Sequence, residues 1–160
     1  MLIRAAEESF LTGMEALAAG RCLEALALFE AAITLERQLG APRVQPRYLS
    51  YYGLCLALEA QRTSDGVELC REAVQLEFYN ADLYCNLARA LLAARRKREA
   101  HQVLRDGLKW ERGHAGIVRE IRAMGSRRRP ALRFLPRGNP INVLLGKMTY
   151  SPPRRGRERI

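Results

Sequence analysis

The sequence predicts an all-α repeat fold followed by an irregular, basic C-terminal tail. Apolar residues recur at helical spacing through the first 125 residues. Three stretches of about 34 residues within that region can be aligned with one another. Five of the seven prolines lie in residues 126–160, which excludes a long helix from most of the tail.

The net charge of +10 comes entirely from the last third of the chain. Residues 1–111 carry 14 Lys or Arg against 15 Asp or Glu, whereas residues 112–160 carry 13 against 2. A near-neutral helical body and a strongly basic end therefore need separate explanations.

The cysteine pattern and the absence of long apolar runs favour a soluble, cytoplasmic protein. The four cysteines show no CxxC spacing and each lies in an apolar helical pattern, so we expect free thiols that pack as small hydrophobic groups. No stretch has the length and apolar character of a signal peptide or of a membrane span.

Three helical hairpins are predicted over residues 6–39, 46–80 and 81–114. Small residues recur where the two helices of a hairpin would cross, and large apolar residues fill the spaces beside them. The recurring small residues are Gly13, Gly53 and Ala88, then Ala25, Gly66 and Ala100, then Ala32, Ala73 and Gly107.

Helix ends are predicted from turn and capping residues. Gly20 is expected to end one helix, Asn80 to start another, and Ser64 or Asp65 to cap a third. An amphipathic segment at 114–125 is expected to form a capping helix that covers the last apolar face of the array.

These three segments resemble tetratricopeptide repeats, although the proline that often ends a family repeat is replaced by Arg37, Phe78 and Arg112. The resemblance implies a right-handed α–α superhelix in which the first helix of each repeat lines a groove that binds a peptide or protein. Carried onto this sequence, the groove residues are predicted to be Phe10, Met14, Arg47, Tyr51, Leu54, Asn86 and Arg89.

No catalytic, metal or cofactor motif is present in the sequence. Phosphate-binding Gly loops, nucleophile elbows and zinc-protease motifs are all missing, and His101 and His114 lack a nearby carboxylate pattern. We therefore expect a non-catalytic adaptor that needs no cofactor, with a protein or peptide as its partner.

The tail at 126–160 leaves three alternatives open: a solvated segment, a segment that folds back on the body, or a segment that binds an anionic surface. A short helix is predicted near 140–146, with Asn139 as its cap. The third alternative, which covers nucleic acid and anionic lipid, would use Arg127, Arg128, Arg129, Arg154 and Arg155. The tail also resembles the ending of short uncharacterised bacterial tetratricopeptide proteins, which implies no function.

Overall fold

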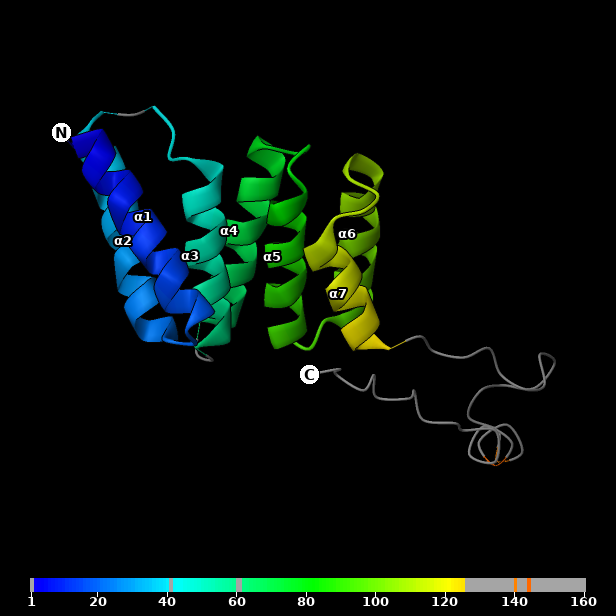
Figure 1. Ribbon diagram of the computed structural model, residues 1–160. Helices are drawn as coiled ribbons and strands as arrows, with labels where there is room; N and C mark the ends of the chain where they lie inside the picture. Colours follow the sequence, from blue (N-terminus) through cyan, green and yellow to red (C-terminus); the bar gives the residue numbers. More distant parts are fainter. Residues whose placement is uncertain (1, 41, 60–61, 126–139, 141–143, 145–160) are drawn as a thin grey trace, which may run out of the picture. The chain divides into compact units, whose positions relative to one another are not determined.

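The computed structural model describes residues 2–40, 42–59, 62–125, 140 and 144. The elements of this part are helices, with no strand among them, so the predicted all-α repeat fold is confirmed (Figure 1). The helices are α1 (Leu2–Ala18), α2 (Cys22–Gln38), α3 (Pro46–Leu58), α4 (Thr63–Leu76), α5 (Ala81–Ala93), α6 (Lys97–Trp110) and α7 (Ala115–Met124).

Consecutive helices pair as antiparallel hairpins, and the hairpins stand side by side in chain order (Figure 1). The pairs α1–α2, α3–α4 and α5–α6 make the most extensive contacts. Neighbouring hairpins meet through α2 with α3 and through α4 with α5, while α3, α5 and α7 contact one another in sequence. Each helix thus packs mainly on its neighbours, as in other helical arrays.

The glycines at the helix crossings leave no room for a side chain, as the sequence predicts. A Cβ added to Gly53 would lie 2.7 Å from the carbonyl oxygen of Gly66. A Cβ added to Gly13 would lie 2.7 Å from Cε1 of Phe29, and one added to Gly107 would lie 2.7 Å from Cδ1 of Ile117. Helices pack at these distances only where a side chain is missing.

Two groups of buried side chains form the core. One lies in the first half of the array and is built on the rings of Phe29 and Tyr48, and the other lies in the second half and is built on Leu87, Leu91 and Leu104. All four cysteines are free; Cys55, Cys70 and Cys85 are buried and Cys22 is half-buried, as the sequence predicts.

The predicted helix ends are confirmed at two turns and wrong at a third. Gly20 follows α1 with a φ of 76°, and the Asn80 side chain accepts a hydrogen bond from the backbone N–H of Asp82 at 3.1 Å. Ser64 and Asp65 do not cap α4, because the helix already begins at Thr63. Asp65 instead pairs with Arg62 at 2.9 Å, across one helical turn.

Helix α7 covers the end of the array by packing on α5 and α6. Its Ile117 is fully buried against Gly107.

The chain divides into two units, residues 1–124 and 125–160. In the second unit the predicted helix at 140–146 lies outside the described residues except for Pro140 and Leu144, which are helical and exposed. None of the described helices has the length and apolar character needed to cross a membrane.

Candidate functional site

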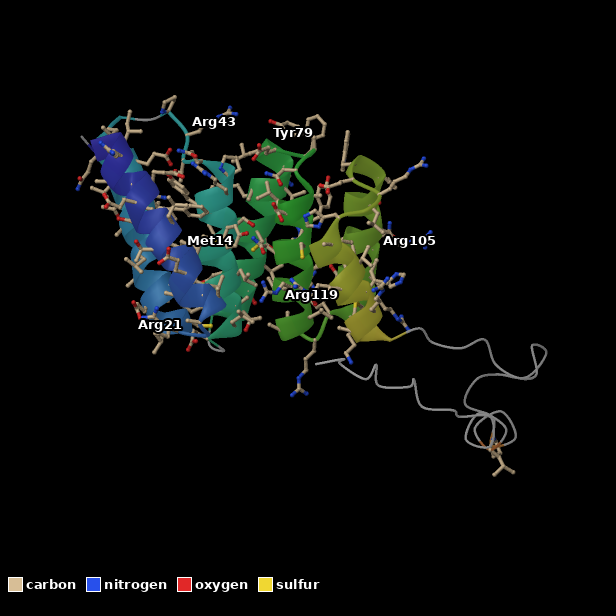
Figure 2. The ribbon with its side chains drawn as sticks, in the orientation of Figure 1. Met14, Arg21, Arg43, Tyr79, Arg105 and Arg119 are labelled. Carbon is tan, nitrogen blue, oxygen red and sulfur yellow. The ribbon has the colours of Figure 1, made fainter. Side chains whose placement is uncertain are left out.

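The predicted groove residues lie on α1, α3 and α5, the first helices of the three hairpins. We call the side of the array to which they belong the first-helix face; its accessible residues are 7, 11 and 14 of α1, 47 and 51 of α3, 82 and 89 of α5, and 119 and 120 of α7. In Figure 2, Arg43 and Tyr79 lie at one edge of the array and Arg21 at the opposite edge, with Met14 and Arg119 between the two edges. The face therefore runs across several repeats.

Phe10 lies beneath this face and not on it. Its ring is 5% exposed and sits 4.8 Å from the ring of Tyr48 and 5.5 Å from those of Phe29 and Tyr51, measured between centroids. Such tilted and edge-on ring pairs stabilise a core beyond the area they bury. Phe10 thus supports the face from below, while Tyr51 and Met14 are half-buried and keep part of their surface exposed.

Arg47 is held by groups of the neighbouring repeat. Its guanidinium forms an ion pair with the carboxylate of Glu7 and lies 5.1 Å from the ring centroid of Phe10. The Tyr48 hydroxyl donates a hydrogen bond to the same carboxylate at 2.8 Å. Burial, followed by this bond to Glu7, raises the pKa of Tyr48 to about 12. Glu7 therefore fastens the first hairpin to the second.

Leu54 and Asn86 are core residues in the structure. Leu54 is 0% exposed, and Asn86 is 3% exposed with its amide nitrogen donating a hydrogen bond to Ser50 Oγ at 3.2 Å. Neither side chain is accessible to a partner in this conformation. The bond between Ser50 and Asn86 instead connects α3 with α5 beneath the face.

Arg89 reaches the capping helix. Its Nε lies 3.7 Å from Oε1 of Glu120 in α7, and its side chain is 36% exposed. Nearby, burial and then the negative charge of Asp82 raise the pKa of Tyr51 above its ordinary value. The guanidinium groups of Arg47 and Arg89 are thus both paired with carboxylates of this chain, although their side chains are 39% and 36% exposed.

Two parts of the face are missing from the sequence prediction. Leu11 stands two residues before Gly13, as Tyr51 stands before Gly53 and Asn86 before Ala88, and it is 53% exposed. The same offset in the alignment could have identified it. Arg119 and Glu120 belong to α7, whose sequence indicates a cap but does not show that the cap extends the face.

The chemistry offered by the rest of the described chain is limited. An open hollow of about 380 Å³ lies at the α1–α2 turn, away from the first-helix face, and is lined by Arg21, Cys22, Leu23, Glu24 and Glu59.

In the part of the chain that the structure describes, no group of three His, Cys, Asp or Glu side chains is placed to hold a metal ion. Burial raises the pKa of Cys55 and Cys70 to about 12 and that of Cys85 to about 11, so these thiols are poor nucleophiles. The five tail arginines predicted to bind anions lie outside the described residues.

Comparison with solved structures shows the same fold in tetratricopeptide repeat (TPR) domains. The TPR domain of Arabidopsis OM64 is 22% identical, with a TM-score of 0.60 over 78% of this chain and 98% of that one. The first TPR domain of human RPAP3 is 14% identical, with a TM-score of 0.62 over 92% and 99% of the two chains. The first TPR of Spaghetti (RPAP3), in a structure with the HSP90 peptide SRMEEVD, is 16% identical, with a TM-score of 0.59 over 76% and 93%.

A match at the level of sequence covers the second half of the array. Residues 57–123, from the end of α3 to α7, match the tetratricopeptide repeat family. No curated protein sequence matches the chain. The family match over residues 57–123, the helical hairpins, the glycine crossings and the shared fold together support a tetratricopeptide repeat protein.

Proposed function

We propose that the chain is a non-catalytic protein-interaction module that binds a peptide or protein segment on the first-helix face. The observation that carries this proposal is a row of partly exposed side chains on three successive first helices. Leu11 and Met14 stand on α1, Tyr51 on α3 and Arg89 on α5, at corresponding places in the repeats. The row presents two apolar side chains, one aromatic ring and one cation to a segment that crosses the helices.

The fold comparison supports a peptide as the ligand. The Spaghetti domain, which shares this fold, was solved in complex with an HSP90 peptide. The first-helix face of the present chain differs from a simple anion clamp because Arg47 is already paired with Glu7 and Arg89 with Glu120. Apolar anchors on the peptide, set against Leu11, Met14 and Tyr51, would then contribute most of the affinity.

Random peptides displayed as a library and selected on the full-length protein test this proposal. Dissociation constants of the selected peptides are then measured for the Leu11→Lys and Met14→Ala variants and for Leu23→Lys. Leu23 is an exposed leucine of α2 outside the face, which makes it the matched control. We expect at least a tenfold loss of affinity, about 1.4 kcal/mol, for each face variant and none for the control. Equal affinities for all three variants and the wild type would exclude the face as the binding site.

A second candidate function is the binding of nucleic acid or an anionic lipid surface through the Arg-rich tail. It is supported by the 13 basic and 2 acidic residues at 112–160. Replacing Arg127, Arg128 and Arg129 by Gln should then weaken binding to DNA or to phosphatidylserine vesicles, with a steep dependence on salt. Binding to both polyanions that is unchanged in this variant would exclude a role for that cluster.

A further inference from the structure

The turn between α5 and α6 carries four consecutive cationic side chains, Arg95, Arg96, Lys97 and Arg98, and all four are exposed. Arg96 is paired with Glu99 at 2.6 Å. Among the described residues, no carboxylate lies within ion-pair distance of Arg95, Lys97 or Arg98. Three positive charges without a carboxylate partner in the described part of the chain thus lie within four consecutive positions, 95–98, which include the first two residues of α6. We call residues 95–98 the α5–α6 turn.

The turn of the first hairpin, between α1 and α2, is an internal control for this one. In both turns a backbone N–H bonds back to the helix at 2.9 Å, from Arg21 to the Ala16 carbonyl and from Arg96 to the Leu91 carbonyl. The pair Arg21–Glu24 in the first turn corresponds to Arg96–Glu99 in the third. The turns differ where Gly20, Cys22 and Leu23 are replaced by Arg95, Lys97 and Arg98.

The fold itself does not call for these three charges. Gly20 adopts a φ of 76°, a left-handed conformation that glycine tolerates, whereas Arg95 occupies the same place with a φ of 59°. A side chain in that conformation is strained, and three like charges in one turn repel each other. Because the first hairpin closes the same turn without them, a structural role does not explain the cations. Backbone strain that is kept at an exposed, charged turn points to a binding function.

We propose that the α5–α6 turn binds the phosphate backbone of double-stranded nucleic acid. Duplex DNA carries one negative charge about every 1.7 Å along its axis, so a turn with three free cations meets several phosphates at once. Two of the three are arginines, whose planar guanidinium groups bind phosphate through paired hydrogen bonds. The contact is made with the backbone, and it carries no sequence specificity.

The composition of the turn favours a duplex over a membrane or a single strand. Residues 93–99 are Ala, Ala, Arg, Arg, Lys, Arg and Glu, with no large apolar or aromatic side chain among them. Membrane-surface segments combine basic residues with apolar ones that enter the bilayer, and single-stranded nucleic acid is bound by aromatic rings that stack on the bases.

The last turn of α7, which includes the exposed Arg122, lies at the same edge of the array as this turn (Figure 1).

The proposal is tested by measuring binding of the full-length chain to a short DNA duplex by fluorescence anisotropy, at several salt concentrations between about 50 and 200 mM. The turn variant combines Arg95→Gly, Lys97→Gln and Arg98→Gln. A control variant combines Arg4→Gln, Arg37→Gln and Arg43→Gln, which are exposed positions elsewhere and give the same change in net charge. Circular dichroism checks that both variants are folded.

We expect the turn variant to bind the duplex at least tenfold more weakly than the control variant. Its plot of log affinity against log salt should be less steep than that of the wild type by about 2 to 3, since each lost phosphate contact removes about 0.9. Equal affinities and slopes for the two variants would overturn the proposal. It would also be overturned by a turn variant that loses binding to phosphatidylserine vesicles but keeps duplex binding, or by binding that depends only on Arg127, Arg128 and Arg129.

Discussion

His114 links the capping helix to the third hairpin through both of its ring nitrogens. Its Nε2 lies 3.0 Å from Oδ1 of Asp82, and its Nδ1 accepts a hydrogen bond from the backbone N–H of Ile117 at 3.2 Å. Because Nδ1 is an acceptor, the proton of the neutral ring is on Nε2, where it is donated to Asp82. One side chain therefore caps the N-terminus of α7 and ties α7 to the start of α5.

Removing this imidazole should loosen the end of the array. We expect His114→Ala to lower the free energy of unfolding by about 1 kcal/mol, the usual cost of losing a helix cap. Urea unfolding followed by circular dichroism measures the change. His101→Ala is the matched control because His101 is exposed on α6, and equal stability of the two variants would contradict a capping role for His114.

The crossing of α3 and α4 should not accept a single added methyl group. A Cβ at Gly66 would lie 2.7 Å from the backbone nitrogen of Ala57 and would also meet the Gly53 carbonyl oxygen, so two helices would have to move apart. Gly66→Ala should therefore destabilise the protein by about 1–3 kcal/mol, despite the better helix propensity of alanine. Gly113→Ala, where a Cβ would meet nothing within 4 Å, should change the melting temperature little.

The buried hydrogen bond between Ser50 and Asn86 should show energetic coupling. Ser50→Ala and Asn86→Ala each leave a polar group buried without its partner, at a cost of about 1–3 kcal/mol. Both single variants break the same bond. The double variant should therefore lose about 0.5–1.5 kcal/mol less stability than the sum of the two single losses. A thermodynamic cycle from urea unfolding measures this term, and strict additivity would argue against the bond.

The strained turn residue should be improvable. Arg95→Gly is expected to raise the free energy of unfolding by about 1 kcal/mol, because glycine adopts a φ of 59° without a steric penalty. The reciprocal change at the first turn, Gly20→Ala, should lower stability by a similar amount. If Arg95→Gly were instead destabilising, the side chain would have a structural role that its exposure does not suggest.

The buried thiol of Cys70 should make stability depend on pH in the alkaline range. Its pKa rises from the ordinary 9.0 to about 12 because burial disfavours the thiolate. Below pH 9 the folded and unfolded chains both keep the proton; between pH 9 and 12 only the unfolded chain releases it, so stability falls as pH rises. The contribution of this group approaches roughly 1.4 kcal/mol per pH unit.

Comparing urea unfolding of the wild type and of Cys70→Ala at about pH 7 and about pH 10 isolates this contribution. The stability advantage of the wild type should shrink at the higher pH. Cys22→Ala, at a half-buried position, provides the control. An advantage that is the same at both pH values would show that Cys70 ionises equally easily in the folded and unfolded chains.

The repeat fold could be predicted because its determinants are local and periodic. Gly53 and Gly66 mark one crossing by the absence of side chains. Small residues stand at the matching positions of the other hairpins, where they are 12 residues apart instead of 13. The prediction that Ser64 or Asp65 caps α4 was wrong for two reasons. The carboxylate of Asp65 pairs with the neighbouring Arg62, and the helix begins one residue earlier, at Thr63.

The binding face could be predicted only in outline. An alignment of repeats shows which side of a helix a residue lies on, but depth depends on the size of side chains from other helices. Phe10 is buried because Phe29, Tyr48 and Tyr51 surround it, and those contacts span up to 41 residues. The internal pairing of Arg47 and Arg89 likewise depends on Glu7 and Glu120, which are far away in sequence.

The paired charges of the first-helix face have a consequence for selectivity. A ligand that approaches Arg47 or Arg89 finds a cation whose counter-ion is already in place, so a new ion pair can form only by exchange for the existing one. Exchange yields little net free energy, because one attraction replaces another of similar strength. Ligands that differ only in their acidic residues would be bound almost equally well, whereas ligands that differ in the size or spacing of their hydrophobic side chains would be told apart.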